Sequence, residues 1–342
     1  MLSQTIQKPS DLTPASYLSG RQFDCWVMTS CWDDRICSDA IADFFQPKIS
    51  HMTPKKVQFT SKGITVVGEL YVPVGSAPNR KRAGIVVSHP MGGVKEQTAG
   101  LHATKFAEEG FVALTFDAAY QGESHEEPAS RRCKFPDVDP ERIGALGICA
   151  SGGYVPFAAQ TDVRIKAVAT VSAADVGQLF REGMEGTAMI IDHDALQETL
   201  RSAGQARIAE AKGEQPPTLP IEPDSPDDIP PETQTLFREG SDYYRTPRAG
   251  HPRSTNRYPL RSYDLMVNYS SYAFMELISR RPPLMVAGAD ADTRYSSEEA
   301  VARAKEPKEL FLVPGKTHIG LYDDLSVSFP KLLDFMIKSL AL

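Results

Sequence analysis

Short, continuously apolar runs recur along the chain from Val57 onward, each bounded by Gly, Pro or polar residues. Runs of this kind are typical of strands that are buried on both faces. The first two, at residues 57–60 and 64–72, flank Ser61-Lys62-Gly63 and predict a β-hairpin. Six further runs follow, at residues 83–88, 111–116, 143–148, 165–171, 283–287 and 310–313.

Helical periodicity occupies several of the segments between these runs. Residues 96–109 place Leu101, Phe106 and Ala107 at helical spacing, and Gly110 ends the pattern. Further helices are predicted to begin at Cys149, to cover residues 297–305 and to close the chain from 329 to 342. Apolar strands that alternate with helices predict an α/β fold, with a mostly parallel sheet covered on both faces.

Two segments depart from this alternation. Residues 1–53 lack it, and we expect an N-terminal extension of unassigned role, amphipathic or disordered, before a domain formed by residues 54–342. Residues 175–282 are much too long for an ordinary connection between two strands. They contain a helical stretch at 195–212 and a Pro- and Asp-rich stretch at 214–231. We expect a helical lid insertion over about 176–282 that shapes the substrate pocket and excludes water.

The most informative motif is the turn at residues 147–153, Gly-Ile-Cys-Ala-Ser-Gly-Gly, between a predicted strand and a predicted helix. A strand, a tight small-residue turn and a helix are typical of a nucleophile elbow, here with Cys149 at its centre. Helix N–H groups directed at such a thiol should lower its pKa and favour the reactive thiolate. Two alternatives are that Cys149 is an apolar filler of the core and that Ser151 is the nucleophile.

Candidate partners for Cys149 follow two later strands. Asp290 and Asp292 come after the run at 283–287, and His318 comes after the run at 310–313. Ligands of parallel sheets bind at the carboxyl ends of strands, and the order Cys, Asp, His is that of an α/β-hydrolase triad. His318 would hold the thiol proton and later deprotonate an alcohol or water, while the aspartate fixes its tautomer. We prefer Asp292 as the acid and keep Asp290 as the alternative, because either could instead cap a turn.

An oxyanion hole should complete this site. One donor is expected to be the backbone N–H of Ala150, and the other the N–H of Met91 in the loop after Ser88. Gly92 and Gly93 would let the backbone approach a substrate, although an ordinary strand-to-helix turn also explains them. For His89 we favour a structural hydrogen bond over contact with the site.

Composition narrows the function classes. The net charge of −7 over 342 residues argues against nucleic acid or an anionic membrane as a partner. No apolar run approaches the roughly 18 residues that span a bilayer, and the N-terminus lacks a secretory signal, so we expect an intracellular, cytoplasmic protein. Five cysteines show no regular pairing pattern, and Cys25, Cys31 and Cys37 lack the close pairs of a zinc site. We therefore expect neither a metal nor a cofactor.

From about Val57 to its end, the chain resembles the α/β-hydrolase group that contains fungal polyketide transferases or thiohydrolases and related bacterial hydrolases. The matching blocks are His89-Pro90 through Thr98, Asp117, Tyr120 through Ser124, Val138 through Gly144, Gly147 through Gly153, Ala291-Asp292-Thr293, Pro314 through His318, and Tyr322-Asp323. The resemblance implies an α/β-hydrolase fold and an acyl-enzyme on Cys149. It further implies that the acyl group comes from a polyketide thioester and passes to an alcohol or water, and it favours Asp292 as the acid.

Partners and alternatives follow from the same resemblance. The donor thioester could be carried by the acyl carrier protein of a polyketide synthase, and the insertion offers Arg245, Arg248, Arg253 and Arg257 to a carrier or its phosphopantetheine phosphate. A solvated charged face is the simpler interpretation of each arginine. The sequence leaves the oligomeric state open, with a homodimer as one option. The alternative functions are a general ester or lactone hydrolase like the dienelactone hydrolases, and a non-catalytic protein with this fold.

One departure from the group concerns residues 125–137. The group has room here for a surface helix, whereas thirteen residues that include Pro128 and Pro136 cannot comfortably supply an average helix with its connections. We therefore expect the helix beside the nucleophile strand to be shortened or missing.

Overall fold

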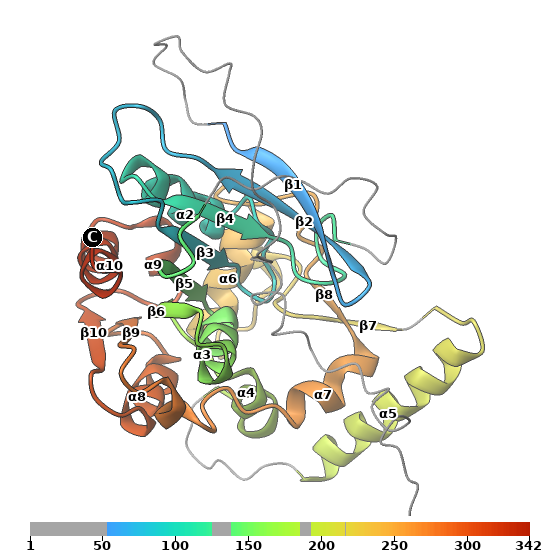
Figure 1. Ribbon diagram of the computed structural model, residues 1–342. Coiled ribbons are helices and arrows are strands. Elements are labelled where there is room, and N and C mark those ends of the chain that lie inside the picture. The colour runs from blue at the N-terminus through green and yellow to red at the C-terminus, as the bar shows by residue number, and fades with distance from the viewer. Residues whose placement is uncertain (1–52, 125–137, 185–192, 216) are drawn as a thin grey trace, which may run out of the picture.

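The computed structural model describes residues 53–124, 138–184, 193–215 and 217–342 (Figure 1). One sheet dominates them, with its strands in the order β1-β2-β4-β3-β5-β6-β9-β10. Its strands are β1 (Lys55–Ser61), β2 (Ile64–Tyr71), β3 (Gly84–Ser88), β4 (Val112–Phe116), β5 (Ile143–Ile148), β6 (Ile165–Val171), β9 (Pro283–Gly288) and β10 (Glu309–Val313). The predicted hairpin β1–β2 is antiparallel, as is β2 to β4, and every pairing from β4 to β10 is parallel.

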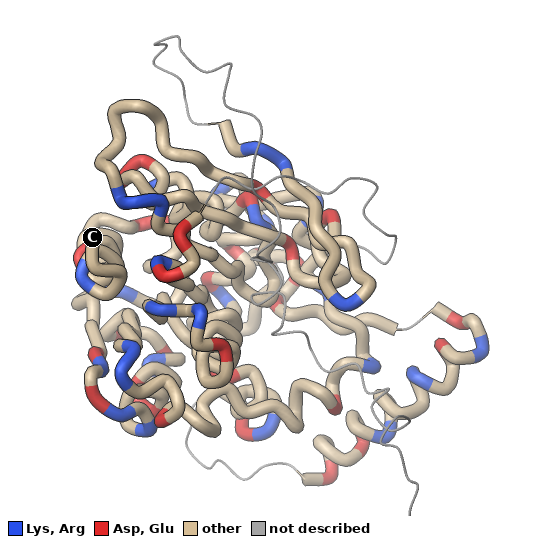
Figure 2. Tube along the Cα trace, viewed as in Figure 1, with Lys and Arg blue, Asp and Glu red and all other residues tan. Residues whose placement is uncertain are grey.

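Helices cover both faces of this sheet, as the apolar strands predicted. Side chains of α2 (Thr98–Glu108) and α10 (Ser328–Ser339) pack with Ile85 and Leu146 on one face. Side chains of α3 (Ser151–Thr161) and α8 (Arg294–Arg303) pack with Val86 and Ala145 on the other. Neighbouring strand residues thus point to opposite layers, and Figure 2 shows the central strands almost free of charged residues. The α/β-hydrolase-type fold is confirmed.

Residues between β6 and β9 form the insertion, which contains most of the remaining elements: α4 (Val176–Glu182), α5 (His193–Ala211), β7 (Thr218–Pro220), η1 (Pro226–Asp228), α6 (Thr235–Arg245), β8 (Arg257–Pro259), η2 (Leu260–Ser262), α7 (Tyr263–Val267) and η3 (Met275–Ile278). Its α6 is strongly attached, since Leu236, Tyr243 and Tyr244 belong to the main core. In contrast, α5 extends away from the sheet at the lower right of Figure 1 and buries only Ala203 and Ala206.

A buried ion network fixes the loop between β3 and α2, which carries part of the candidate site. The Lys95 side chain is almost fully buried, and its Nζ lies 2.7 Å from Asp117, 2.8 Å from Glu123 and 2.8 Å from Glu96. A buried ammonium group needs such partners, because an unpaired charge would be costly to bury. This block of the family resemblance therefore has a structural role.

Several sequence expectations lie outside the described residues. They concern the N-terminal extension, the cysteines at positions 25, 31 and 37, and the shortened helix at 125–137. Among the described residues, no helix combines the length and hydropathy needed to cross a bilayer. Within the same residues, no group of three His, Cys, Asp or Glu side chains is arranged to hold a metal ion.

Candidate active site

Cys149 occupies a sharp, strained turn between β5 and α3. Its φ of 56° lies in the left-handed region, which costs energy for a residue with a side chain. The backbone holds this conformation through hydrogen bonds from the Cys149 N–H to Val171 O (3.0 Å) and from the Ala174 N–H to Cys149 O (3.0 Å). Gly147 is required on the preceding strand, since a Cβ there would lie 2.0 Å from the carbonyl oxygen of Ser151. Small residues thus build a sharp turn between strand and helix at the position that the sequence predicts, while the role of Cys149 as nucleophile stays a prediction.

The thiol of Cys149 meets two backbone amides and one hydroxyl. The N–H groups of Ala150 and Met91 donate to the sulfur, and Tyr322 is hydrogen-bonded to it through its side chain. Burial nevertheless raises the pKa of Cys149 to about 11, and these hydrogen bonds offset only part of that increase. The expectation that the turn lowers this pKa is therefore wrong, because desolvation of the sulfur outweighs the amides and the helix N-terminus.

The loop that carries Met91 is fixed from two sides. Ser151 Oγ donates to the carbonyl oxygen of His89 at 2.5 Å and lies 2.8 Å from Ser88 Oγ. Gln121 Nε2 donates to Met91 O at 2.8 Å. Ser151 thus joins the turn at Cys149 to the loop that carries Met91. His89 makes the hydrogen bonds of a structural residue, with Nδ1 at 2.6 Å from Pro90 O and Nε2 accepting from the Ala118 N–H.

The side chain of Tyr322 lies between those of His318 and Cys149 and connects them by hydrogen bonds. The imidazole is fully buried, with Nε2 3.0 Å from the Tyr322 hydroxyl, which in turn is hydrogen-bonded to the thiol. Its Nδ1 lies 2.5 Å from Thr293 Oγ1. Burial lowers the pKa of His318 to about 3, so the ring is neutral at ordinary pH. The chain of contacts Cys149–Tyr322–His318–Thr293 thus joins a partly exposed thiol to three buried side chains, and the raised pKa of the thiol and the lowered pKa of the imidazole keep both groups neutral.

The two candidate acids lie near this chain without a described hydrogen bond to His318. Asp292 Oδ2 accepts from the Leu236 N–H at 2.8 Å, at the N-terminus of α6, where the helix dipole favours a carboxylate. Its Oδ1 is buried without a hydrogen-bond partner among the described residues, and burial raises the pKa of Asp292. Asp290 is exposed. The role of Asp292 as the triad acid stays a prediction, and Thr293 occupies the hydrogen-bonding position at Nδ1.

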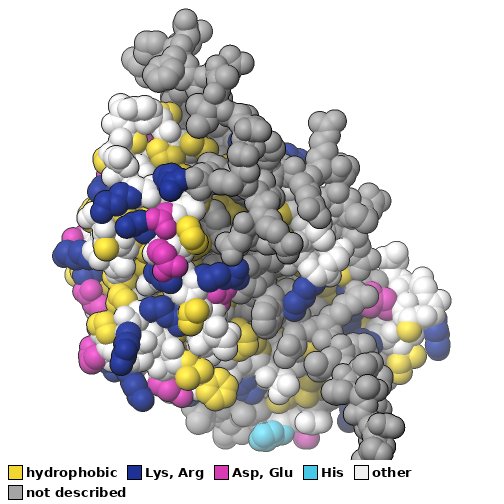
Figure 3. Space-filling model, viewed as in Figure 1, with side chains coloured by type: hydrophobic (Ala, Val, Ile, Leu, Met, Phe, Trp, Pro, Cys, Tyr) yellow, Lys and Arg dark blue, Asp and Glu magenta, His cyan; other side chains and the backbone are white. Residues whose placement is uncertain are grey.

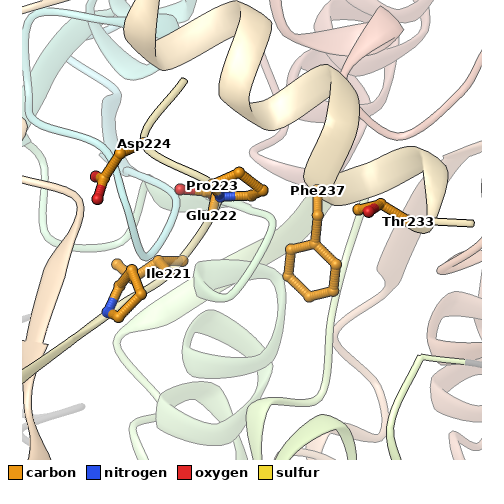
Figure 4. Close-up of a pocket in the computed structure, with 7 residues that line it drawn as sticks. Ile221, Glu222, Pro223, Asp224, Thr233 and Phe237 are labelled. Atoms are coloured by element: carbon orange, nitrogen blue, oxygen red, sulfur yellow. The ribbon is translucent and has the colours of Figure 1, made fainter. Parts of the chain in front are cut away.

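The insertion covers the site through α6 and the segment after β7. The Tyr243 ring packs edge-on against Tyr322, with centroids 5.2 Å apart. Glu222, beside β7, is buried close enough for its charge to raise the pKa of Cys149. A cavity of about 470 Å³ opens beside it between two walls, and Figure 4 shows the Ile221–Asp224 segment on one side and Thr233 and Phe237 on the other.

The four arginines that the sequence offered to a carrier protein have carboxylate or carbonyl partners within the protein. Arg248 binds Asp323 and Asp242, Arg253 binds Glu96, and Arg257 binds Asp224. Arg245 donates to Ser254 O at 2.8 Å. On the face seen in Figure 3, positive and negative side chains are interspersed. The pairing agrees with the simpler interpretation of these arginines as charged surface.

Tyr322, Thr293 and Glu222 are functional candidates that sequence reasoning did not assign. Tyr322 and Thr293 stand four residues after His318 and one after Asp292, inside blocks that carry the family resemblance. Those blocks were a usable signal for both. No comparable signal marks Glu222, because it lies in the Pro- and Asp-rich stretch of the insertion.

The sheet order, the turn at Cys149 and the His318 loop define an α/β-hydrolase fold. The crystal structure of the α/β hydrolase GrgF from Penicillium sp. sh18 matches with a TM-score of 0.67 at 21% identity, over 85% of this chain and all of GrgF. No family model matches the chain.

Two bacterial relatives are more similar. YcjY of Escherichia coli (strain K12) is 37% identical over 294 residues, which cover 80% of this chain and 94% of YcjY. The crystal structure of PA2218 from Pseudomonas aeruginosa matches with a TM-score of 0.75 at 32% identity, over 90% of this chain and all of PA2218. The chain belongs to the family that includes YcjY and PA2218, and its fold is that of the α/β hydrolases.

Shorter matches link the chain to two named fungal proteins. The polyketide transferase claH of Penicillium crustosum is 31% identical over 137 residues, 34% of this chain and 43% of claH. The thiohydrolase aneE of Aspergillus aculeatus is 28% identical over 172 residues, 45% of this chain and 52% of aneE.

Proposed function

We propose that this protein is a cysteine-dependent acyltransferase or thioesterase. It takes an acyl group from a thioester onto Cys149 and passes that group to an alcohol or to water. The fungal matches, a polyketide transferase and a thiohydrolase, support a thioester donor and a place in secondary metabolism. A polyketide acyl group, delivered by an acyl carrier protein, is the donor that this proposal favours.

The observation that carries the proposal is the continuous hydrogen-bonded chain from the Cys149 thiol through Tyr322 to Nε2 of His318. A buried core cysteine has no need of such a chain. The N–H groups of Ala150 and Met91 at the same sulfur are the donors that an oxyanion would use. We therefore assign Cys149 as nucleophile, His318 as base and these two amides as the oxyanion hole.

The neutral starting state suggests the order of proton movements. As sulfur attacks the carbonyl carbon, the thiol proton passes to the Tyr322 oxygen and the phenol proton passes to His318 Nε2. The carbonyl oxygen becomes negative and accepts from Ala150 and Met91 in place of the sulfur. The C–S bond of the donor then breaks, and its thiolate receives the proton back from the imidazolium. Water or an alcohol attacks the resulting acyl-Cys149, and the proton that it loses restores the thiol.

In a Ser-His-Asp triad one acid both orients the histidine and stabilises its positive charge. Here we assign the first role to Thr293 and the second to Asp292. Thr293 can accept from Nδ1–H of His318 and thereby keep Nε2 free to accept from Tyr322. Asp292 has a buried free oxygen and lies next in sequence to Thr293. We propose that Asp292 stabilises the imidazolium when it forms, after a change in its contact with α6.

Trapping the acyl adduct tests the nucleophile and the substrate class together. Intact-mass spectrometry with a panel of acyl thioesters of N-acetylcysteamine should show one acyl group per chain, on the peptide that contains Cys149. The adduct should be absent in Cys149→Ala and present in Ser151→Ala. A folded wild-type protein that gives no adduct with any thioester or ester would refute the proposal. Free acid against ester among the products then separates hydrolysis from transfer.

A further inference from the structure

Glu222 is a buried carboxyl group for which the mechanism above has no use. Its side chain is only 9% exposed, and Oε2 has no hydrogen-bond partner among the described residues. Burial raises the pKa of Glu222 to about 7, although the positive charge of Arg245 opposes the increase. A carboxyl group without partners is costly to bury, which points to a ligand that supplies the missing hydrogen bond.

The protein holds this carboxyl group in a fixed position. The Glu222 N–H donates to Asn256 Oδ1 at 2.9 Å, and Asn256 Nδ2 donates back to Glu222 O at 2.8 Å. Asn256 is itself buried and adopts a φ of 59°. Two hydrogen bonds to one side chain set the backbone of Glu222, so the direction of its carboxylate is built into the fold.

The carboxylate of Glu222 lies beside the loop that carries Met91 and Gly92. A Cβ on Gly92 would lie 3.2 Å and 3.4 Å from the two carboxylate oxygens, and a Cβ on Gly240 of α6 would lie 3.0 Å from Glu222 Cγ. Glycines on both sides thus leave room for the carboxyl group. Gly92 follows Met91, whose amide donates to the Cys149 sulfur, and the charge of Glu222 acts on Cys149, Tyr244 and Tyr322. The carboxylate therefore lies beside the residue that follows Met91, whose amide would hold the carbonyl oxygen of an acyl-Cys149.

The cavity of about 470 Å³ reaches the same carboxyl group from outside. Its other lining is mostly apolar, with Pro220, Ile221, Pro223 and Phe237, together with Thr233 and Asp224. Asp224 is engaged by Arg257 at 2.7 Å, whereas no ion pair of Glu222 is found among the described residues, and Figure 4 shows both residues in the lining. Such a cavity fits a molecule with an apolar body and one hydrogen-bond donor.

We propose that Glu222 and this cavity form the acceptor site, in which the carboxylate binds the hydroxyl or amine of an apolar acyl acceptor. This inference rests on the proposed acyl-Cys149. As the acceptor oxygen or nitrogen bonds to the acyl carbon, its proton passes to Glu222 and the C–S bond breaks, releasing the Cys149 thiolate. The Glu222 proton then returns to the sulfur, which restores both groups.

Partition of one acyl-enzyme between two products tests the site. The acyl donor is the N-acetylcysteamine thioester that gives the Cys149 adduct, and the acceptor probes are benzyl alcohol and benzylamine. We expect wild type to form benzyl ester or benzyl amide beside free acid. Glu222→Gln should lower the ratio of transfer to hydrolysis at least tenfold, while the rate of adduct formation changes less than threefold.

Asp242→Asn is the control, because it removes an ion-paired carboxylate of the same insertion that does not line the cavity. Its transfer ratio should stay within twofold of wild type. Benzyl methyl ether, which has the same apolar body without a donor, should leave the rate of deacylation of the wild-type enzyme unchanged. This last measurement needs no variant and stands even if Glu222→Gln folds poorly.

Three results would overturn the acceptor site. They are an unchanged transfer ratio in Glu222→Gln, an equal loss of adduct formation in that variant, and deacylation that the ether accelerates as much as the alcohol does. An adduct that forms on Cys149 but never transfers to either probe also removes the acceptor site while the proposed function survives. If no adduct forms at all, the proposed function itself fails.

Discussion

The two sides of the candidate site are built by different means. On the nucleophile side, the Cys149 turn is fixed by short-range features: small residues, a positive φ and hydrogen bonds to the end of β6. On the histidine side, Tyr322 in α9 (Gly320–Asp323) is close to His318 in sequence, but His318 and Asp292 take their other partners from more distant segments, with Thr293 at the start of α8 and Leu236 in the insertion. The comparison teaches that a nucleophile elbow can be predicted from a local motif, while the base and acid depend on what packs over them.

The same contrast predicts how severely substitutions on each side of the site should lower the activity. A change at the elbow should remove chemistry outright, because the backbone geometry leaves no substitute for the nucleophile. Loss of His318 itself should be nearly as severe, but changes at the residues around it should act by degrees, since Tyr322, Thr293 and Asp292 all help to orient one imidazole and stabilise its charge.

The largest effect is expected from the nucleophile itself. Cys149→Ala should reduce kcat by more than about 10⁴-fold, and His318→Ala should do nearly the same, because members of one catalytic unit act together. Ser151→Ala is the control and should keep a substantial part of the activity. Thioester turnover of the three purified variants is the measurement. Activity that survives in Cys149→Ala but not in Ser151→Ala would move the nucleophile to Ser151.

The next effect concerns the ionisation of the thiol in the free enzyme. Burial raises the pKa of Cys149 to about 11, so the thiolate fraction grows with pH up to that value. Alkylation by iodoacetamide should therefore accelerate about tenfold per pH unit between roughly pH 7 and 10. Mass spectrometry of the Cys149 peptide follows the rate. A plateau that begins near neutral pH would instead indicate a thiolate–imidazolium pair.

Removing the hydroxyl that joins the two sides should have an intermediate effect. Tyr322→Phe keeps the aromatic packing against Tyr243 but removes the hydrogen bonds to Cys149 and His318. We expect kcat to fall about 10- to 100-fold, in the range typical of general acid–base groups. Tyr243→Phe, which leaves those hydrogen bonds in place, is the control. Equal activity of Tyr322→Phe and wild type would show that His318 reaches the thiol without Tyr322.

The smallest effect is expected at the aspartates. Asp292→Asn should lower kcat/KM about tenfold, because it weakens the contact with the N-terminus of α6 and removes the charge nearest Thr293. Asp290→Asn, at an exposed side chain, should change it less than twofold. Steady-state kinetics of both variants measure kcat/KM, and their melting temperatures show whether a loss of activity comes from a loss of stability. A greater loss in Asp290→Asn would reassign the acid, whereas a loss near 10⁴-fold in Asp292→Asn would make it a full triad member.

The strands of the sheet could be predicted closely. Both ends of each predicted strand lie within two residues of the observed ends. Short apolar runs bounded by turn-forming or polar residues are typical of buried strands, which explains the agreement. The helix after Cys149 begins at Ser151 rather than at Cys149, since the left-handed turn must finish first. Local rules were sufficient at these positions.

The site was harder to predict where its energetics depend on burial. The sequence suggested a lowered pKa for Cys149 from the helix N-terminus, but burial of the sulfur raises that pKa even though hydrogen bonds from Tyr322, Ala150 and Met91 oppose the increase. Asp292 could be identified as a candidate from its strand end, yet nothing local indicated that the N–H of Leu236 would occupy its carboxylate. Likewise, Glu222 acquired its environment only when Gly92 and Gly240 came to lie beside it.

The sequence by itself determined the α/β architecture, the strained turn at Cys149 and the strand ends that carry Asp292 and His318. These depend on apolar periodicity and on small residues, which act over a few neighbours in the chain. The tertiary structure alone decided which side chains touch the thiol and the imidazole, and with what charge. Such contacts join residues far apart in sequence, and the ionisation of each group depends on how much water the surrounding fold excludes.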